Sequence, residues 1–293
     1  MIIVKIMGGL GNQMFQYAAG RSLSQKLNTG LKLDVEDYKW GRYKLHKYCL
    51  DKLSINTKKA GTQEIKKLKF KTASIIERIS FKFENKERER GEKSYKNMGT
   101  VFDRNFFNLN DDLYIEGYWQ SEKYFIDIKD IILGEFILKK PAAGKNLEHL
   151  KTINKTESVS LHIRRGDYIN NEKTKSLHGI DLKLYYENAV NLIKKSMKNP
   201  YFFIFSDEPD WVRENFRGEF KFTVVDCNTG RTGYEDMRLM SACKHNIIAN
   251  SSFSWWGAWL NQNPEKIVTA PKNWFTDKSI DTTDLIPENW IRL

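Results

Sequence analysis

The sequence predicts an α/β protein built on parallel sheets with helices packed against both faces. The second half of the 293-residue chain alternates short apolar segments with segments of helical spacing. The first half opens with an apolar segment, a glycine-rich turn and a helical pattern. The chain is 40% hydrophobic, which supplies enough apolar material for about two domain cores at this length.

The second half supports this class element by element. Residues 158–163 alternate apolar and polar side chains, which predicts a strand with His162 on its polar face. The unbroken apolar run at 201–205 is typical of a strand that is covered on both faces. The other expected elements are helix 181–198, helix 209–216, strand 222–225, helix 234–243, strand 246–249, helix 253–261 and strand 267–270.

The first half begins with a predicted strand at 2–7, a glycine-rich turn at 8–13 and a helix at 14–27. Gly9 and Gly11 have the spacing of the first two glycines of a dinucleotide-binding turn, but Met14 stands where the third small residue is required. Asp34 follows at the distance expected of a ribose-binding acid. An NAD-dependent oxidoreductase therefore remains one alternative, and the glycines indicate that the backbone approaches some group closely.

Polar clusters follow three predicted strands of the second half, at the carboxyl ends where open α/β sheets bind ligands. They are 162–167 (His-Ile-Arg-Arg-Gly-Asp), 206–208 (Ser-Asp-Glu) and 250–252 (Asn-Ser-Ser). Paired arginines match phosphate oxygens and keep their charge, and hydroxyls at a helix start can bind a phosphate. The alternatives are an Arg–Asp ion pair and a plain serine cap. Together the clusters predict a nucleotide site.

The chain carries 48 Lys and Arg against 37 Asp and Glu, a net charge of +11. Residues 1–150 hold 28 basic and 19 acidic residues, and the excess is concentrated at 58–96. We expect solvated amphipathic helices there, with contact to an anionic membrane as the functional alternative. No recognised nucleic-acid motif accompanies the charge, so we expect no nucleic-acid partner.

Several classes of protein are disfavoured by missing patterns. The three cysteines have no Cys-x-x-Cys spacing, and no apolar run is long enough to span a bilayer. The N-terminal segment lacks the features of a secretory leader, so we expect a cytoplasmic protein. No Asp-x-Asp, His-Glu-x-x-His or phosphate-loop pattern occurs, which predicts a phosphate site without metal ligands. The domain boundary is expected near the Pro/Gly/Ala segment at 139–145, giving domains 1–145 and 146–293.

The motifs taken together resemble the bacterial α-1,2-fucosyltransferases of glycosyltransferase family 11. They are Gly8–Ala18, Gly117–Phe125, His162–Tyr168 and Asn250–Gly257, and the similarity runs in order from Met1 to Phe275. The resemblance implies a GT-B-like fold, with two Rossmann-like domains facing across a cleft. It also implies transfer of fucose from GDP-β-L-fucose to the 2-hydroxyl of a galactose in an oligosaccharide or lipid-linked glycan, with inversion, no cofactor and no required metal.

The resemblance also assigns roles to residues. Arg164 would contact the leaving diphosphate, supported by Arg165 and Asp167, while Asn12 approaches from the other domain. The remaining donor-binding candidates are Gly9, Gly11, His162, Asp207, Ser251, Ser252 and Phe253. The base that takes the acceptor proton is not evident, and Asp34, Glu116 and Asp167 are its candidates. The alternatives are a GDP-sugar transferase of another linkage or acceptor, and a non-catalytic basic nucleotide-binding or nucleic-acid-binding protein.

Overall fold

The computed structural model describes residues 1–43, 46–70, 93–166, 168, 171–216 and 220–293. The chain forms two compact units, Met1–Ile137 and Leu138–Leu293. The Pro/Gly/Ala segment at which the sequence suggests a boundary therefore lies at the start of the second unit.

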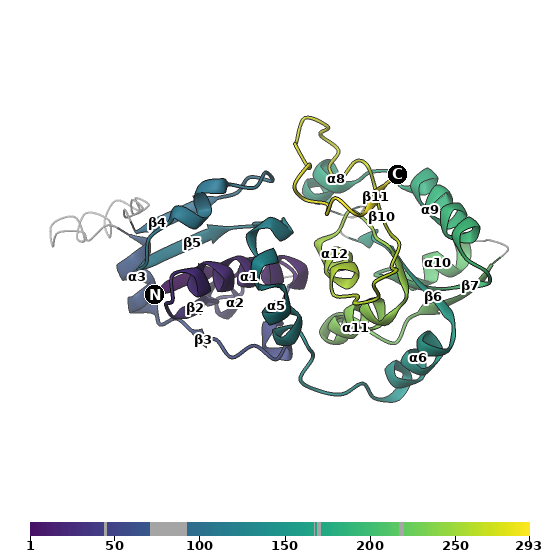
Figure 1. Cartoon of the computed structure of the whole chain (residues 1–293), viewed down its shortest axis with the longest axis horizontal. Coiled ribbons are helices and arrows are strands. Elements are labelled where there is room, and N and C mark those ends of the chain that lie inside the picture. Colours follow the sequence, from purple (N-terminus) through teal and green to yellow (C-terminus); the bar gives the residue numbers. More distant parts are fainter. Residues whose placement is uncertain (44–45, 71–92, 167, 169–170, 217–219) are drawn as a thin grey trace. The chain divides into compact units, whose positions relative to one another are not determined.

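The first unit contains a sheet of five parallel strands in the order β3-β2-β1-β5-β4 (Figure 1). Its strands are β1 (Ile2–Lys5), β2 (Leu31–Asp34), β3 (Lys58–Lys59), β4 (Ser94–Asn97) and β5 (Leu113–Gly117). From β1 the chain adds β2 and then β3 on one side of β1, and it places β4 and β5 on the other side, with β5 next to β1. The strand order therefore reverses between β1 and β5, and the loops after these two strands open toward a common edge.

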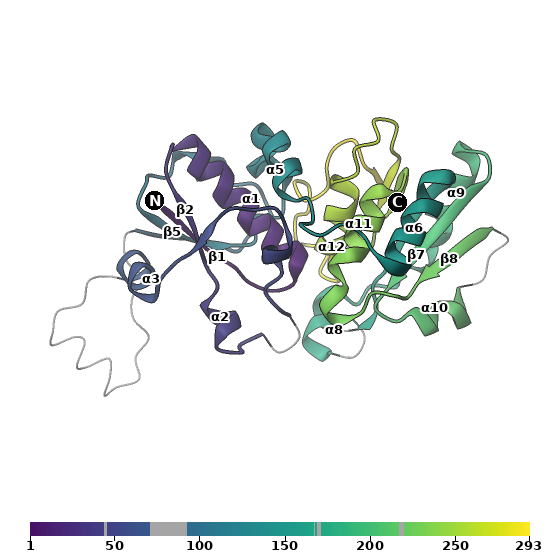
Figure 2. The same cartoon turned by 90° about the horizontal axis from the view of Figure 1, so that it is seen from below.

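Helices cover both faces of this sheet (Figure 2). Ile3 on β1 joins a buried cluster with Ile65 and Leu68 of α3 (Thr62–Lys69), whereas Gly20 of α1 (Leu10–Lys26) lies against Val4. Neighbouring strand residues point to opposite faces, so α1 and α3 pack on opposite sides. Among the described residues, this unit also contains α2 (Glu36–Lys39), α5 (Lys129–Glu135) and the 3₁₀ turns Leu50–Lys52, Arg104–Asn108, Glu122–Tyr124 and Ile126–Ile128.

Helix α1 begins at Leu10, four residues before the predicted start. Gly8 has a φ of +71°, a conformation that glycine adopts readily, and the chain then enters the helix with Gly9 as the N-cap. The Gln13 amide already donates to the Gly9 carbonyl at 3.0 Å. The polar residues assigned to the turn from the sequence thus form the first helical turn.

The second unit contains a sheet of six parallel strands in the order β11-β10-β9-β6-β7-β8. The strands are β6 (Glu157–Ile163), β7 (Pro200–Ser206), β8 (Lys221–Val225), β9 (His245–Ile247), β10 (Val268–Ala270) and β11 (Ile291–Arg292). Numbered within the unit, this is the 3-2-1-4-5-6 order of a Rossmann sheet, with the reversal between β6 and β9. The predicted parallel sheet is confirmed. Strand β11 was not predicted from the sequence, because a strand of two residues is too short to show an alternating pattern.

Two buried clusters lie on opposite faces of this sheet. Helices α9 (Lys183–Ser196) and α10 (Pro209–Asn215) pack on one face, and α6 (Gly144–Lys155) and α11 (Tyr234–Ala242) pack on the other. The described part of this unit also contains α8 (Glu172–His178), α12 (Ser252–Trp259) and the 3₁₀ turn Gly230–Thr232. Covering both faces explains why even the polar side of β6 is buried, including His162 at 5% exposure.

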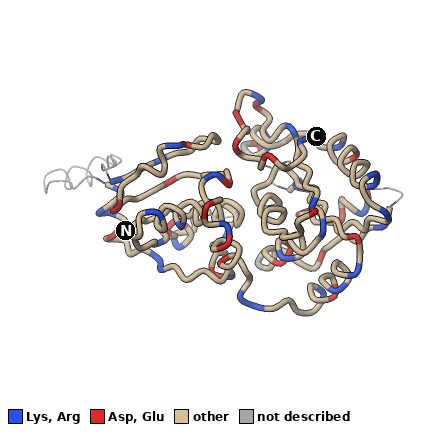
Figure 3. The backbone as a smooth tube through the Cα atoms, in the orientation of Figure 1, with Lys and Arg blue, Asp and Glu red and all other residues tan. Residues whose placement is uncertain are grey.

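Basic residues are interspersed with acidic residues over the described parts of both units (Figure 3). In the basic stretch, α3 buries Ile65 and Leu68 and exposes Lys66 and Lys67, as expected of an amphipathic helix. Most of the stretch, residues 71–92, lies outside the described residues. Within the described chain, no helix combines the length and apolar character needed to cross a bilayer.

Candidate functional site

The carboxyl edge of the second sheet brings together the loops after β6 and β9, at the point where the strand order reverses. The Tyr168 hydroxyl donates to the Asn250 carbonyl at 3.0 Å, and the Arg164 guanidinium lies 5.5 Å from the Tyr168 ring centre. The His162 and Phe253 rings are 5.9 Å apart. The structure thus brings together two of the three predicted polar clusters directly.

The third cluster joins them through Asp207, which follows β7. One carboxylate oxygen forms an ion pair with Arg164 Nη1 at 3.0 Å, and the other accepts a hydrogen bond from the Arg165 amide at 3.0 Å. A β-carbon on Gly166 would lie only 2.5 Å from the Asp207 carboxylate, so a glycine is needed there. Asp207 does not cap α10, whose N-cap is Glu208. It holds the arginine loop and leaves the Arg164 side chain 26% exposed.

Arg165 points to a different environment. Its guanidinium lies 3.5 Å from the Trp211 ring centre, and its Nε donates to Glu208 at 3.1 Å. The side chain is therefore anchored on α10 by a cation–π contact and an ion pair. Asp167, the predicted supporting acid, lies outside the described residues.

His162 is a neutral imidazole at the bottom of this site. Burial, together with the nearby Arg164 charge, lowers its pKa to about 3. Its backbone carbonyl accepts from the Tyr186 hydroxyl at 2.9 Å. Its Nδ1 is buried and has no hydrogen-bond partner among the described residues. An unpaired buried nitrogen is costly, which favours a ligand as its partner.

The loop after β9 is held by side-chain hydrogen bonds. The buried Asn250 side-chain amide donates to the carbonyls of His178 and Trp274, both at 3.0 Å, so it fixes the loop itself. Ser251 is the N-cap of α12 and accepts from the Phe253 amide at 3.3 Å, as the simple capping alternative requires. The amide groups and positive dipole end of a helix start still make this loop suitable for binding a phosphate. Trp255, Trp256 and Trp259 of this helix are buried packing residues.

Two groups at this edge were not selected from the sequence. His178 stacks on Tyr168 with ring centres 5.0 Å apart and an interplanar angle of 14°. Asp236, at the start of α11, accepts from the Asn228 side chain at 2.8 Å, and burial raises its pKa to about 7. Neither residue belongs to a recognisable sequence motif, because the contacts that distinguish it, with Tyr168 for His178 and with Asn228 for Asp236, form only in the folded domain.

The first unit has a corresponding edge at the end of β1. Asn12 accepts from the Gln120 side chain, which follows β5, at 2.7 Å, so the two loops at this reversal point are linked. Gln13 is fully buried and donates to the carbonyls of Gly8 at 2.9 Å and Lys47 at 2.7 Å. Gly9 and Gly11 form the start of α1, and their contact with a donor stays a prediction.

The two predicted acids of this unit, Asp34 and Glu116, lie near the same edge, and both contact other residues of the protein. Asp34 is buried and accepts from the Tyr114 hydroxyl at 2.8 Å and from the Glu36 amide at 3.0 Å, contacts that favour a structural role. Glu116 is buried with an oxygen 3.6 Å from Lys5 Nζ. Their assignment as acceptor or base residues stays a prediction.

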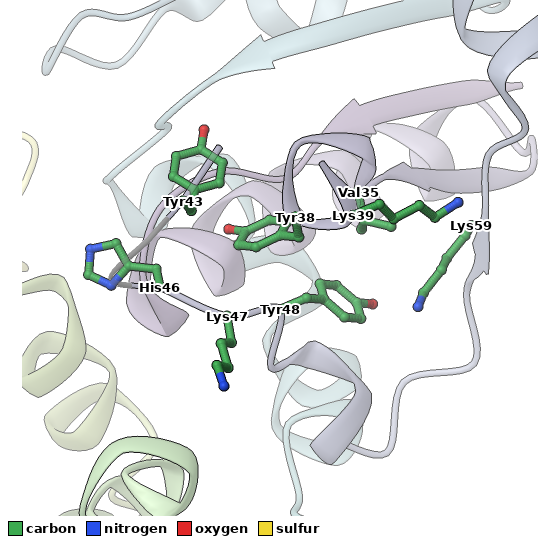
Figure 4. A pocket seen from close by; sticks show the side chains of 8 residues that line it. All are labelled: Val35, Tyr38, Lys39, Tyr43, His46, Lys47, Tyr48 and Lys59. Carbon is green, nitrogen blue, oxygen red and sulfur yellow. The ribbon is translucent and has the colours of Figure 1, made fainter. Parts of the chain in front are cut away.

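A pocket of about 370 Å³ lies beyond β2 in the first unit (Figure 4). Its lining residues are Val35, Tyr38, Lys39, Tyr43, His46, Lys47, Tyr48 and Lys59. The Tyr38 hydroxyl donates to the Gly8 carbonyl at 2.6 Å, so one wall is tied to the glycine-rich turn. The sequence alone did not indicate this pocket.

Comparison with known proteins agrees with this architecture. An Escherichia coli protein named alpha-1,2-colitosyltransferase is 36% identical over 299 residues, covering 100% of this chain and 99% of that protein. The O-antigen biosynthesis glycosyltransferase WbnK of Escherichia coli is 32% identical, with 98% of both chains covered. Among solved structures, a mutant of Arabidopsis thaliana FUT1 in complex with GDP matches with a TM-score of 0.53 and 11% identity, covering 98% of this chain and 74% of that chain.

These similarities confirm the predicted GT-B-like class of two Rossmann-like domains. The family model described as Glycosyl transferase family 11 matches residues 1–293, the whole sequence. The chain belongs to glycosyltransferase family 11.

Proposed function

We propose that this enzyme transfers L-fucose from GDP-β-L-fucose to the 2-hydroxyl of a galactose residue, forming an α-1,2 linkage in an O-antigen or related surface glycan. The observation that carries the proposal is the placement of Arg164. It is held by Asp207 at the strand-order reversal, opposite the start of α12. A guanidinium and a helix N-terminus together suit the two phosphates of a nucleotide sugar.

In the proposed reaction, the acceptor oxygen forms a bond to the anomeric carbon while the bond from that carbon to the β-phosphate oxygen breaks. The bonding electron pair leaves with GDP, and the acceptor proton passes to a base or to solvent. Arg164 stabilises the growing diphosphate charge, and its fixed position avoids reorganisation during the step. Asp34, Glu116 and Asp167 remain the base candidates.

The nucleoside is assigned to the part of the second-unit site around His162 and Asp207. Neutral His162 offers its unpaired Nδ1, and Asp207 lies beside it. Ser251, Ser252 and Phe253 line the phosphate loop, and Arg165 supports Arg164 from its anchor on Trp211. Asn12, with Gly9 and Gly11, is assigned to the sugar or diphosphate. We propose no metal or other cofactor, since placed arginines carry the phosphate charge.

Colitosyl transfer is the second candidate, favoured by the 36% identity to the colitosyltransferase along the whole chain. Colitose is L-fucose without its 3-hydroxyl. A site that hydrogen-bonds this hydroxyl rejects colitose strongly, whereas an apolar site discriminates weakly. The two candidates therefore differ in one polar contact to the sugar.

The test is transfer from GDP-fucose, GDP-colitose and GDP-mannose to a panel of β-galactosides, with and without EDTA, followed by NMR linkage analysis. We expect an α-1,2 product from GDP-fucose that is insensitive to EDTA. A product only from GDP-colitose supports the second candidate. Absence of transfer from all three donors, by a protein whose melting temperature does not respond to GDP, contradicts both.

We also propose that the basic first half contacts the anionic inner face of the cytoplasmic membrane, where lipid-linked acceptors reside. Support comes from the charge of residues 1–150. Flotation with anionic and neutral liposomes tests it, and equal binding to both contradicts it.

A further inference from the structure

The pocket of the first unit combines aromatic and cationic groups. Three of its lining residues are tyrosines, three are lysines, one is His46, and none is acidic. Its volume of about 370 Å³ lies within the range of small-ligand sites, roughly 300–1,000 Å³. A site of this composition matches a compact ligand that carries negative charge.

The lysine charges are not compensated within the pocket. Lys39, Lys47 and Lys59 form no ion pair within the described ranges of the chain, and Lys59 lies 4.7 Å from the centre of the Tyr48 ring. The acids near these lysines in sequence have other partners: Asp37 is paired with Lys5 at 3.1 Å and with Arg42 at 2.9 Å, and Asp51 is paired with Lys52 at 3.3 Å. Glu36 accepts a hydrogen bond from the Thr62 hydroxyl. The pocket therefore presents net positive charge to a ligand.

The tyrosines add flat surfaces and hydrogen-bond donors. The Tyr38 and Tyr43 ring centres are 4.9 Å apart, and His46 lines the same pocket (Figure 4). Burial raises the pKa of both Tyr43 and Tyr48 to about 12, so their hydroxyls stay protonated and can donate to an anion. Amphipathic aromatic side chains suit a sugar ring, which has apolar faces and a polar rim.

The pocket is attached to the core of its own domain. Gln13 holds the Lys47 carbonyl and accepts from the Cys49 amide at 2.9 Å, while Tyr38 is bonded to the glycine-rich turn. These contacts fix two sides of the pocket against the start of α1. Such preorganisation lowers the entropic cost of binding.

We propose that this pocket is an acceptor subsite for an acidic sugar unit, one that bears a carboxylate or a phosphate. The inference rests on the proposed function, because it names the acceptor class for the same transferase. The acid group would lie among the lysines and the sugar ring against the tyrosines.

The test measures binding directly, by ligand-observed NMR with the full chain. The probes are methyl β-D-glucuronide, glucose 1-phosphate and the neutral methyl β-D-glucoside. The pocket variant is Lys47→Gln combined with Lys59→Gln. The matched control is Lys66→Gln combined with Lys67→Gln, which removes the same charge from the exposed face of α3.

We expect the wild type and the control to bind an acidic probe more tightly than the neutral one. The pocket variant should lose about tenfold in affinity for that probe, as expected for charged hydrogen bonds. Preference for the glucuronide identifies a carboxylate ligand, and preference for the phosphate identifies a sugar phosphate. Equal binding of all three probes, or equal loss in the control, overturns the inference.

The experiments distinguish a wrong subsite inference from a wrong proposed function. If the subsite inference alone is wrong, GDP-sugar transfer proceeds and the acidic and neutral probes bind alike. If the proposed function alone is wrong, the charge-selective binding persists without any transfer. With acidic and neutral galactosides as acceptors, the pocket variant should raise the acceptor KM only for the acidic one and leave the donor KM unchanged.

Discussion

At the residue scale, the site depends on how each charged side chain is held. Arg164 and Arg165 are neighbours in sequence, yet Asp207 directs one into the site and Trp211 anchors the other. His162 stays neutral because burial and Arg164 both oppose its protonation. Two adjacent arginines thus acquire different roles from their tertiary partners.

Replacing Arg164 tests this division. We expect Arg164→Ala to lower kcat by about 10²–10³-fold, because a fixed donor to the developing phosphate charge is lost. Steady-state kinetics with circular dichroism measures the effect. Arg213→Ala, which removes an exposed arginine paired with Asp210 and Asp226, serves as the control. Equal kcat values in the two variants would show that Arg164 does not stabilise the transition state.

Asp236 makes stability depend on pH. Its folded pKa is raised to about 7, so the favourable contribution of the protonated form is fully present below pH 4 and declines as the pH rises to 7. We expect Asp236→Asn to become progressively more stable than the wild type between pH 4 and 7, with a constant difference above. Thermal melts across this range measure the difference.

Asp277→Asn is the matched comparison, since hydrogen bonds from Ser279 lower the Asp277 pKa and reverse the sign. The Asp277→Asn variant should not melt at a higher temperature than the wild type at high pH. A pH-independent melting difference for Asp236→Asn would contradict the assignment.

At the element scale, the start of α1 organises the first unit. The buried Gln13 side chain satisfies two carbonyls and one amide, and it joins the glycine-rich turn to residues 47–49. The sequence pattern places Gln13 in the turn, whereas in the structure it lies in the first turn of α1 and links separate segments. The pocket and the turn therefore depend on the same side chain.

We expect Gln13→Leu to lower the free energy of unfolding by about 1–3 kcal/mol, because buried backbone groups lose their partners. Urea denaturation measures this change. Gln25→Leu is the control, since Gln25 is exposed on the same helix and its side chain accepts a hydrogen bond from Arg21 at the surface. A control effect as large as that of Gln13→Leu would show that the buried hydrogen bonds contribute little.

At the scale of the whole molecule, the chain consists of two units that each contain a parallel sheet. If the nucleotide binds at the reversal of the second sheet, GDP should slow amide hydrogen exchange at residues 162–166 and 250–254. Exchange near the tyrosine–lysine pocket should change little, because that pocket is assigned to the acceptor. Mass spectrometry of the full chain with GDP measures both regions. Protection confined to the pocket would reverse the assignment of donor and acceptor.

Much of the fold follows from local pattern. The apolar segment at 201–205 lies within β7, and the helical segment at 234–243 corresponds to α11, because burial on two faces and helical spacing both leave a clear periodicity. Two-residue strands such as β3 and β11 leave no such trace. The start of α1 was misplaced because its first turn is made of residues that also suit a loop.

The sequence by itself determined the α/β class, the position of the three polar clusters at strand ends and the family resemblance, since these depend on spacing along the chain. Only the tertiary structure decided that Asp207 forms an ion pair with Arg164, that Asp34 accepts a hydrogen bond from Tyr114, and that tyrosines and lysines line a pocket. These contacts depend on which segments lie next to one another at the edge of a sheet. The order of the strands determines this, and the strand order results from the packing of the whole domain.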